Sequence, residues 1–413
     1  HNYDQTLALS LMEMDAAGEL EPHARFMTDL ESRGRLDRAV EGLPDAVTIS
    51  ERAHAGLGLV RPELAVLVAY GKIELSRDIV ESTAADDHRL EKVVDAYFPK
   101  PLRKYHDAIR RHRLRREIIA TVVANDAVNR CGPSFPSRLM AAAACDARAF
   151  VAAYEAAKTV LDIPALWEAT AALDGKIPAQ GQMKVFRKLA AILRAQTFWL
   201  ARRSARDGAD ITALIARYGG ASRTLKPLVP SALSPLEAAG VEVVVQDLVA
   251  AGAPEALARS VGALQPLTTA ADLVDIAEAS SWPLDAVARL YHQTGQAFAF
   301  DRLRAAVGAY RAGDYFERTA VRRLIEDLLS EQALLTRTIM DFAGSGQAGA
   351  DHHSAEAAVA SWAALRREPV QAAHRTLAEI EASGGDWSFA KLTIAHAALR
   401  ELATLPGKAR KGG

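Results

Sequence analysis

The stretch HRLRREIIATVVANDAVNR, residues 112–130, gives the clearest indication of a helical fold, because its apolar residues recur with helical spacing. At 100° per residue, one stripe of such a helix carries Leu114, Ile118, Val122 and Val128. Ile119 and Val123 lie on a different face of the same helix. The pattern therefore predicts a central helix that other helices contact from more than one side.

Two amide side chains interrupt that apolar stripe. Asn125 and Asn129 fall among its buried positions. A buried amide without a hydrogen-bond partner costs about 1 to 3 kcal/mol. We therefore expect each amide to bond a carbonyl, a helix end or a side chain from another element.

Helical spacing continues along the whole chain, and β-branched alternation is rare, with residues 241–245 as the one stretch that resembles a strand. The sequence therefore predicts an all-α fold, an irregular multi-helix bundle in two helical subdomains. The expected helices lie near residues 4–17, 21–33, 61–82, 86–97, 101–131, 135–160, 163–174, 179–205, 208–218, 236–252, 254–263, 268–280, 283–308, 314–343, 355–382 and 387–404.

The 413 residues exceed the roughly 250 to 300 that one hydrophobic core accommodates, so more than one packed unit is expected. We predict a first helical subdomain at 1–218 and a second at 236–406, joined by a Pro/Gly-rich linker at 219–235. The segment 344–353 is small and polar and is expected to be a mobile loop. The tail 407–413 has no apolar anchor and is expected to be disordered.

The composition narrows the possible partners. The formal net charge is −1, so no overall field attracts phosphate or anionic lipid, and neither nucleic acid nor a membrane is expected as a partner. No apolar run approaches the ~20 residues that cross a bilayer. Cys131 and Cys145 are too few for a disulfide framework, which indicates a reducing, cytoplasmic location. The chain opens at His1 without an initiator Met and reads as a piece of a longer polypeptide.

Three short motifs resemble functional sites but lack the required context. The glycines of a G-x-G-x-x-G pattern follow a helical run and not a strand, so they predict a flexible interhelical loop: Gly344, Gly346 and Gly349. His352 and His353 are adjacent and have no further ligand nearby, so solvated histidines are expected. Asp86 and Asp87 begin a D-D-x-x-D pattern that Leu90 breaks. No G-x-S-x-G or other nucleophile signature occurs, and we expect no catalytic, cofactor or metal residue.

Residues 101–131 also carry a concentration of cations, which could form a phosphate or RNA site. These residues are Arg103, Lys104, Arg110, Arg111, Arg113, Arg115 and Arg116. They occupy several helix faces and lack interleaved aromatic residues for base stacking. A solvated or subunit-facing surface is the preferred interpretation.

Residues 58–73, GLVRPELAVLVAYGKI, predict the start of a helix. Pro62 suits the first turn, where its missing N–H is no loss, and Glu63 favours the positive end of the helix dipole. Gly71 lies on the apolar stripe and allows another helix to approach closely. This segment therefore contributes to the architecture and not to chemistry.

Several strings together resemble one known family: NYDQTLALSL at 2–11, residues 58–73, YFPKPL at 97–102, residues 112–130 and the loop that begins at Gly132. In this order they resemble the C-terminal region of the large bacterial NAD-specific glutamate dehydrogenases. The match is strong over the first half and looser from about residue 205. We expect Thr where Val60 stands and Ala where Gly71 stands, so another group has to cap the helix start.

The resemblance implies that the intact enzyme oxidatively deaminates L-glutamate to 2-oxoglutarate and ammonia with NAD. The catalytic domain would be an absent part of the same chain, the intact enzyme a homo-oligomer, and no cofactor would bind this segment. The role implied is a non-catalytic support that packs on the catalytic domain and positions it or the oligomer. The alternative is a free-standing helical module for protein interaction or effector binding. Candidate packing residues in the matching strings are Arg61, Glu63, His112, Arg116, Glu117, Asn125 and Asn129.

Overall fold

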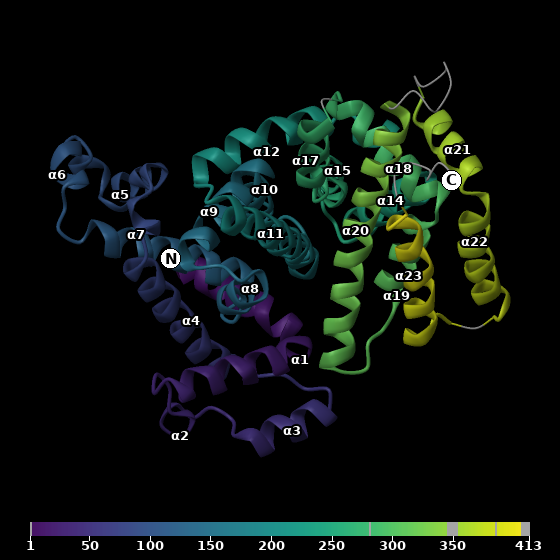
Figure 1. The fold of residues 1–413 in the computed structure, drawn as a ribbon. Coiled ribbons are helices and arrows are strands. Elements are labelled where there is room, and N and C mark those ends of the chain that lie inside the picture. Colours follow the sequence, from purple (N-terminus) through teal and green to yellow (C-terminus); the bar gives the residue numbers. More distant parts are fainter. Residues whose placement is uncertain (1, 281, 345–353, 385, 406–413) are drawn as a thin grey trace. The chain divides into compact units, whose positions relative to one another are not determined.

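The computed structural model describes residues 2–280, 282–344, 354–384 and 386–405. Every regular element within these ranges is a helix, so the predicted all-α fold is confirmed (Figure 1). The chain divides into two compact units, one of His1–Gly220 with Asp247–Leu264 and one of Ala221–Gln246 with Gln265–Gly413. Neither unit is continuous in sequence.

The first unit contains the helices α1 (Asn2–Ser32), α2 (Arg38–Glu41), α3 (Ala46–His54), α4 (Arg61–Glu81), η1 (Ala84–Asp86), η2 (His88–Leu90), α5 (Glu91–Tyr97), η3 (Lys100–Leu102), α6 (His106–Arg110), α7 (Arg115–Cys131), α8 (Phe135–Ala143), α9 (Ala147–Val160), α10 (Ile163–Ala171), α11 (Ala179–Asp207), most of α12 (Ile211–Leu225), and α15 (Glu255–Gly262). α14 (Pro235–Ala250) begins in the second unit and ends in the first.

The second unit contains α13 (Val229–Ala232), α16 (Leu264–Leu267), α17 (Ala270–Ser280), α18 (Leu284–Ala297), α19 (Phe300–Ala309), α20 (Tyr315–Gly344), α21 (Ala355–Leu365), α22 (Arg367–Ala382) and α23 (Phe389–Ala403). α18 packs against α17, α19, α20 and α21, and α23 packs against α19, α20 and α22. Trp362 is fully buried in this unit, with its ring 5.5 Å from that of Phe298.

The central position of α7 is confirmed, because this helix contacts α1, α4, α5, α8 and α11. Its side chains Ile119, Val123 and Val128 are buried, as the sequence pattern predicts. Leu114 is 46% exposed, because the helix begins one residue later and Leu114 does not belong to the buried stripe. α4 crosses close to the end of α7, where a Cβ on Gly71 would lie 2.8 Å from the carbonyl oxygen of Pro133.

Several predicted helix boundaries are wrong. The expected helices 4–17 and 21–33 are one helix, α1, which tolerates Pro22. Ala144 has a left-handed φ of 50°, and Asp146 accepts a hydrogen bond from the amide of Ala149 at 2.9 Å, so the expected helix 135–160 is two. Ala299, with a φ of 63°, divides the expected helix 283–308 in the same way. The expected helix 101–131 contains η3, α6 and α7.

The predicted linker 219–235 is largely helical. α12 continues through Gly219 and Gly220 to Leu225, and α13 begins at Val229 after a short turn. Because a helix interior only disfavours Gly by about 1 kcal/mol, the surrounding turns can keep these glycines helical. The division into subdomains 1–218 and 236–406 stays a prediction. Residues 241–245 lie within α14 and not in a strand.

Candidate functional site

A partly buried carboxylate, Asp126, forms the charged centre of the first unit; its side chain is 25% exposed. Its oxygens accept hydrogen bonds from Arg130 Nε at 2.7 Å, from the Tyr154 hydroxyl at 2.9 Å and from Lys158 Nζ at 2.8 Å. Arg130 lies one turn further along α7, and Tyr154 and Lys158 occupy successive turns of α9. Glu155 also pairs with Lys158, at 2.7 Å. The cluster therefore ties α9 to the central helix.

The electrostatics of this cluster favour the charged forms. Burial by itself raises the pKa of Asp126, but Lys158 and Arg130 outweigh burial and hold that pKa far below its usual range. Burial lowers the pKa of Lys158, yet Glu155 and Asp126 raise it by more. The Arg130 guanidinium also lies 4.5 Å from the centre of the Trp167 ring. All of these charges are engaged within the protein, so the cluster acts as a structural tie.

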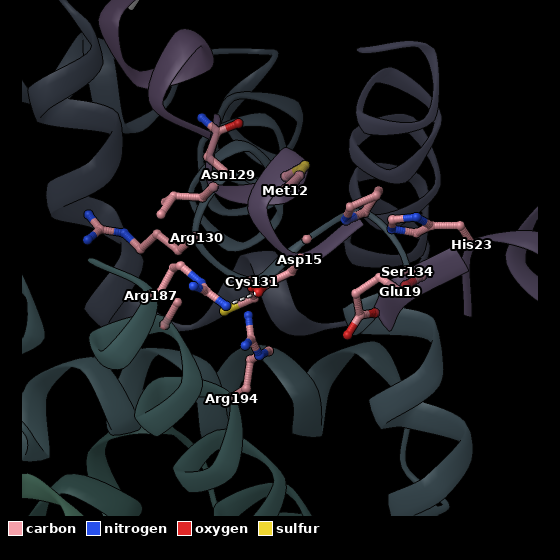
Figure 2. A pocket seen from close by; sticks show the side chains of 14 residues that line it. Met12, Asp15, Glu19, His23, Asn129, Arg130, Cys131, Ser134, Arg187 and Arg194 are labelled. Atoms are coloured by element: carbon pink, nitrogen blue, oxygen red, sulfur yellow. Dashed lines mark hydrogen bonds and ion pairs between the residues drawn. The ribbon is translucent and has the colours of Figure 1, made fainter. Parts of the chain in front are cut away.

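A small cavity adjoins this cluster, between α1, the end of α7 and α11 (Figure 2). The cavity volume is about 40 Å³. Figure 2 shows Arg187 and Arg194 reaching from α11 towards Cys131, and His23 on the other side of the cavity. Asp15 and Glu19 of α1 supply carboxylates to its wall.

Two neutral groups in the cavity wall are strongly perturbed by burial. Burial lowers the pKa of His23 to about 4, and the charge of Glu19 only partly offsets this effect. His23 is therefore neutral at pH 7, and its Nδ1 has no hydrogen-bond partner in the described part of the chain. Burial raises the pKa of Cys131 to about 12, so this residue is a neutral thiol.

The second unit has its own buried charged cluster, centred on Glu237. This carboxylate bonds His292 Nδ1 at 2.7 Å and Arg304 at 2.7 Å. Arg304 also bonds the amide oxygen of Gln332, whose nitrogen donates to the Tyr291 carbonyl at 2.7 Å. Burial raises the pKa of Glu237, but His292 and Arg304 lower it to about 2. This cluster joins α14, α18, α19 and α20.

The predicted packing residues at the start of α4 form intrachain contacts. Glu63 accepts a hydrogen bond from the backbone N–H of Val60 at 2.8 Å, so it supplies the cap that Val60 cannot. The same carboxylate binds Arg52 at 2.6 and 2.9 Å. Arg61 pairs with Glu13 of α1 and lies 3.3 Å from the Ser10 hydroxyl. Together these residues attach α4 to α1 and α3.

The predicted residues near the start of α7 differ in their contacts. Arg116 binds both oxygens of Asp86 at 2.5 and 2.6 Å and the carbonyls of Val80 and Ser82 at 2.9 and 2.6 Å, so it caps the end of α4. His112 is exposed, and its Nδ1 accepts a hydrogen bond from the backbone N–H of Leu114 at 3.1 Å. Glu117 is exposed, and no partner is found for it among the described residues.

The prediction for the two stripe amides is wrong. Asn125 is half-buried, and no described group bonds its side chain. Asn129 lines the cavity, and its buried Oδ1 has no partner within the described ranges. The residue with the predicted type of partners is Asp126, between them. The signal in the sequence was a carboxylate four residues before Arg130 on an apolar helix, together with the Tyr154 and Lys158 pair at the same spacing.

An exposed surface lies on the segment that contains α5, η3 and α6. Its apolar side chains are 46 to 57% exposed: Tyr97, Leu102, Tyr105 and Leu114. Four exposed cations have no ion pair with any described residue: Lys100, Lys104, Arg111 and Arg113. We call residues 97–114 the basic apolar surface. Its exposed tyrosines correct the expectation that aromatic residues are not interleaved with these cations.

The remaining motifs carry no site in the described residues. No group of three or more His, Cys, Asp or Glu side chains in the described ranges could hold a metal ion. Of the expected glycine loop, Gly344 ends α20, while 345–353, with His352 and His353, lies outside the described residues, as does 407–413. Asp86 pairs with Arg116, and Asp87 caps η2. None of the described helices combines the length and apolar composition needed to cross a bilayer.

A family model described as "Glutamate dehydrogenase, C-terminal" matches residues 56–401. The chain belongs to this family. The NAD-specific glutamate dehydrogenase of Halomonas elongata is 32% identical over 405 residues, which is 98% of this chain and 24% of that protein. Those of Pseudomonas aeruginosa and Mycobacterium tuberculosis are 31% and 27% identical, over 98% and 100% of this chain.

The match extends well beyond the strings that carry the resemblance, because it includes the looser second half of the chain. As a glutamate dehydrogenase C-terminal domain, the chain spans about a quarter of the length of the curated relatives it matches. Both charged clusters and the basic apolar surface lie within the matched residues 56–401, whereas the part of the cavity wall that α1 supplies lies before them.

Proposed function

We propose that this chain is the non-catalytic, helical C-terminal part of an NAD-specific glutamate dehydrogenase. It packs on the rest of the polypeptide and positions the catalytic domain or the oligomer. The intact enzyme would convert L-glutamate to 2-oxoglutarate and ammonia, with NAD bound outside this chain, in the cytoplasm. Domain orientation controls the cleft in which hydride transfer occurs, so a support of this kind affects turnover.

The observation that carries the positioning role is the basic apolar surface. Tyr97 and Tyr105 are more than half exposed, in a segment rich in Arg. Tyrosine and arginine are the residues most enriched where protein surfaces dock, and burial of such apolar area contributes roughly 25 cal/mol per Å². An acidic surface on the catalytic part of the polypeptide would fit it.

The same surface fits nucleic acid less well. Leu102 and Leu114 are nearly half exposed and offer nothing to bases or phosphates. Glu91 and Asp95 lie beside Arg110, at 3.9 and 3.6 Å, and would repel phosphates. A protein partner therefore remains the preferred interpretation.

The test uses the polypeptide as its gene encodes it, with Tyr105→Ala and Arg111→Ala together. We expect glutamate-dependent NADH formation to fall and hydrogen exchange in residues 97–114 to rise. The control is Ile394→Ala with Arg375→Ala, a similarly exposed apolar and cationic pair in the second unit. Equal activities of the two variants, with unchanged exchange, would contradict docking at this surface.

A second assay addresses the non-catalytic assignment directly. The 413-residue chain, purified alone, should form no NADH from L-glutamate and NAD. Glutamate-dependent NADH production by this chain would overturn the assignment. The alternative, a free-standing interaction or effector-binding module, predicts that Tyr105→Ala with Arg111→Ala leaves dehydrogenase activity unchanged and releases a separate acidic protein.

A further inference from the structure

The charges that line the cavity at the end of α7 do not balance. Arg130 is neutralised by Asp126, and Arg187 pairs with Asp15. Glu19, the other carboxylate in the wall, pairs with Arg138 at 3.0 Å. Among the cations that line the cavity, Arg194 remains without an ion pair to a described residue.

Arg194 is half-buried, and none of the side chains that the structure describes forms a hydrogen bond or ion pair with it. The end of α7 at Cys131 offers it only the partial negative charge of a helix C-terminus. One positive charge beside the cavity therefore lacks a full counter-charge. A guanidinium that is partly withdrawn from water is stabilised when an anion or several hydrogen-bond acceptors bind it.

The size of the cavity limits which chemical groups can bind Arg194 inside it. A cavity of roughly 10 to 15 Å³ is enough for one water molecule. The cavity volume of about 40 Å³ therefore has room for a small group of a few heavy atoms. A carboxylate group, with one carbon and two oxygens, has this size, and a guanidinium binds its two oxygens with two parallel N–H donors.

The other walls suit a carboxylate as well. His23 is neutral, buried and directed towards the cavity in Figure 2, and its Nδ1 lacks a partner in the described chain, so an imidazole N–H in the matching tautomer can donate to an oxygen. Cys131 is a neutral thiol and adds no competing charge. Asn129 can present its amide N–H₂ by rotation of the side-chain amide.

We propose that this cavity binds the carboxylate group of a small organic acid, with Arg194 as its ion-pair partner and His23 as a neutral hydrogen-bond donor. The site is separate from the basic apolar surface, and the proposal does not depend on the proposed function. The ligand is a free small carboxylate; a carboxylate of the polypeptide itself, or water alone, is the competing occupant.

The experiment uses sodium acetate as the probe and sodium chloride at the same ionic strength as the reference, with the full polypeptide. Thermal unfolding and calorimetric titration measure binding for the wild type, Arg194→Gln and the control Arg202→Gln, an exposed cation on the same helix. We expect acetate to bind the wild type and Arg202→Gln equally. Arg194→Gln should weaken binding by at least about ten-fold, the loss expected for one charge-assisted hydrogen bond.

Arg194→Lys keeps the charge and should bind acetate with an intermediate affinity, so it serves if Arg194→Gln does not fold. Acetate binding that is equal in all variants would overturn the proposal. So would an absence of acetate binding to the wild type, with or without a lower unfolding temperature in Arg194→Gln, because water or a carboxylate of the polypeptide would then occupy the cavity.

Discussion

Replacement of Asp126 by Asn tests whether the buried charged cluster holds α7 and α9 together. The substitution keeps the size of the side chain and an acceptor for the Tyr154 hydroxyl, but removes the charge. Arg130, whose side chain is 18% exposed, then loses its carboxylate, while Lys158 keeps Glu155 at 2.7 Å. Breaking a fully buried ion pair costs about 3 to 5 kcal/mol. Because Asp126 is 25% exposed and Lys158 keeps its pair with Glu155, the expected loss is at the lower end, near 3 kcal/mol.

Hydrogen exchange of the α7 and α9 amides, followed by mass spectrometry, measures this loss locally. A loss of about 3 kcal/mol corresponds to a roughly 150-fold faster exchange where opening of these helices limits protection. The control is Glu117→Gln, an exposed carboxylate without a described partner on the same helix, which should change exchange little.

The difference between wild type and Asp126→Asn should also depend on pH. The pKa of Asp126 is lower in the folded chain than in the unfolded chain. Its contribution to the free energy of unfolding is therefore complete above the unfolded pKa, near pH 4, and is lost as the pH falls towards the folded pKa. The exchange difference should therefore be constant from pH 7 to 5 and narrow below about pH 4. A loss below about 1 kcal/mol, equal to that of Glu117→Gln, would refute the assignment of Asp126 as a structural tie.

Three further outcomes are expected. Gly71→Ala should lower the free energy of unfolding of the first unit by about 1 to 3 kcal/mol in urea, because the clash of a Cβ 2.8 Å from Pro133 outweighs the ~1 kcal/mol gained in helix propensity. The control is Gly18→Ala, in open space on α1, which should raise the free energy of unfolding. A Gly71→Ala variant as stable as the wild type would contradict the close approach of α4 to Pro133. Between pH 7 and 5, the free energy of unfolding of the wild type should fall by about 2 kcal/mol more than that of His23→Gln. The reason is that His23 binds a proton in the unfolded chain but stays neutral in the folded chain, where burial lowers its pKa to about 4. Equal decreases in the two proteins would contradict the burial of His23. Cys131 should resist iodoacetamide at pH 8 until the chain unfolds, since burial raises its pKa to about 12, and rapid native alkylation would contradict that state.

The sequence predicted helices most reliably where capping and periodicity agree. The helix expected at 61–82 is α4, Arg61–Glu81, and the one at 314–343 is α20, Tyr315–Gly344. Boundaries failed where a single residue in the left-handed region ends a helix, as Ala144 and Ala299 do. Alanine has no intrinsic preference for that conformation, so its position there depends on how the flanking helices pack.

The candidate site was predicted only in part. Glu63 and Arg116 were singled out as packing residues, and the structure shows the caps and ion pairs that they form. Amides on an apolar stripe need partners, which predicts hydrogen bonds for Asn125 and Asn129, yet the side chain between them that forms such bonds is Asp126. Helical periodicity assigns a residue to a face of the helix, but Asn125, Asp126 and Asn129 lie on neighbouring positions of one face. The pattern therefore does not distinguish which of the three forms the buried contacts.

Three properties of this chain could be predicted from its residues alone: its helical fold, the central place of α7 and its family. Each of these depends on local spacing or on strings of adjacent residues. Three other features depend on how the helices pack: the pairing of Asp126 with Lys158, 32 positions away, the cavity beside Arg194, and the exposure of Tyr97 and Tyr105. The physical reason is that helix periodicity extends over three or four residues, whereas contacts between helices depend on the rotation and crossing of each pair.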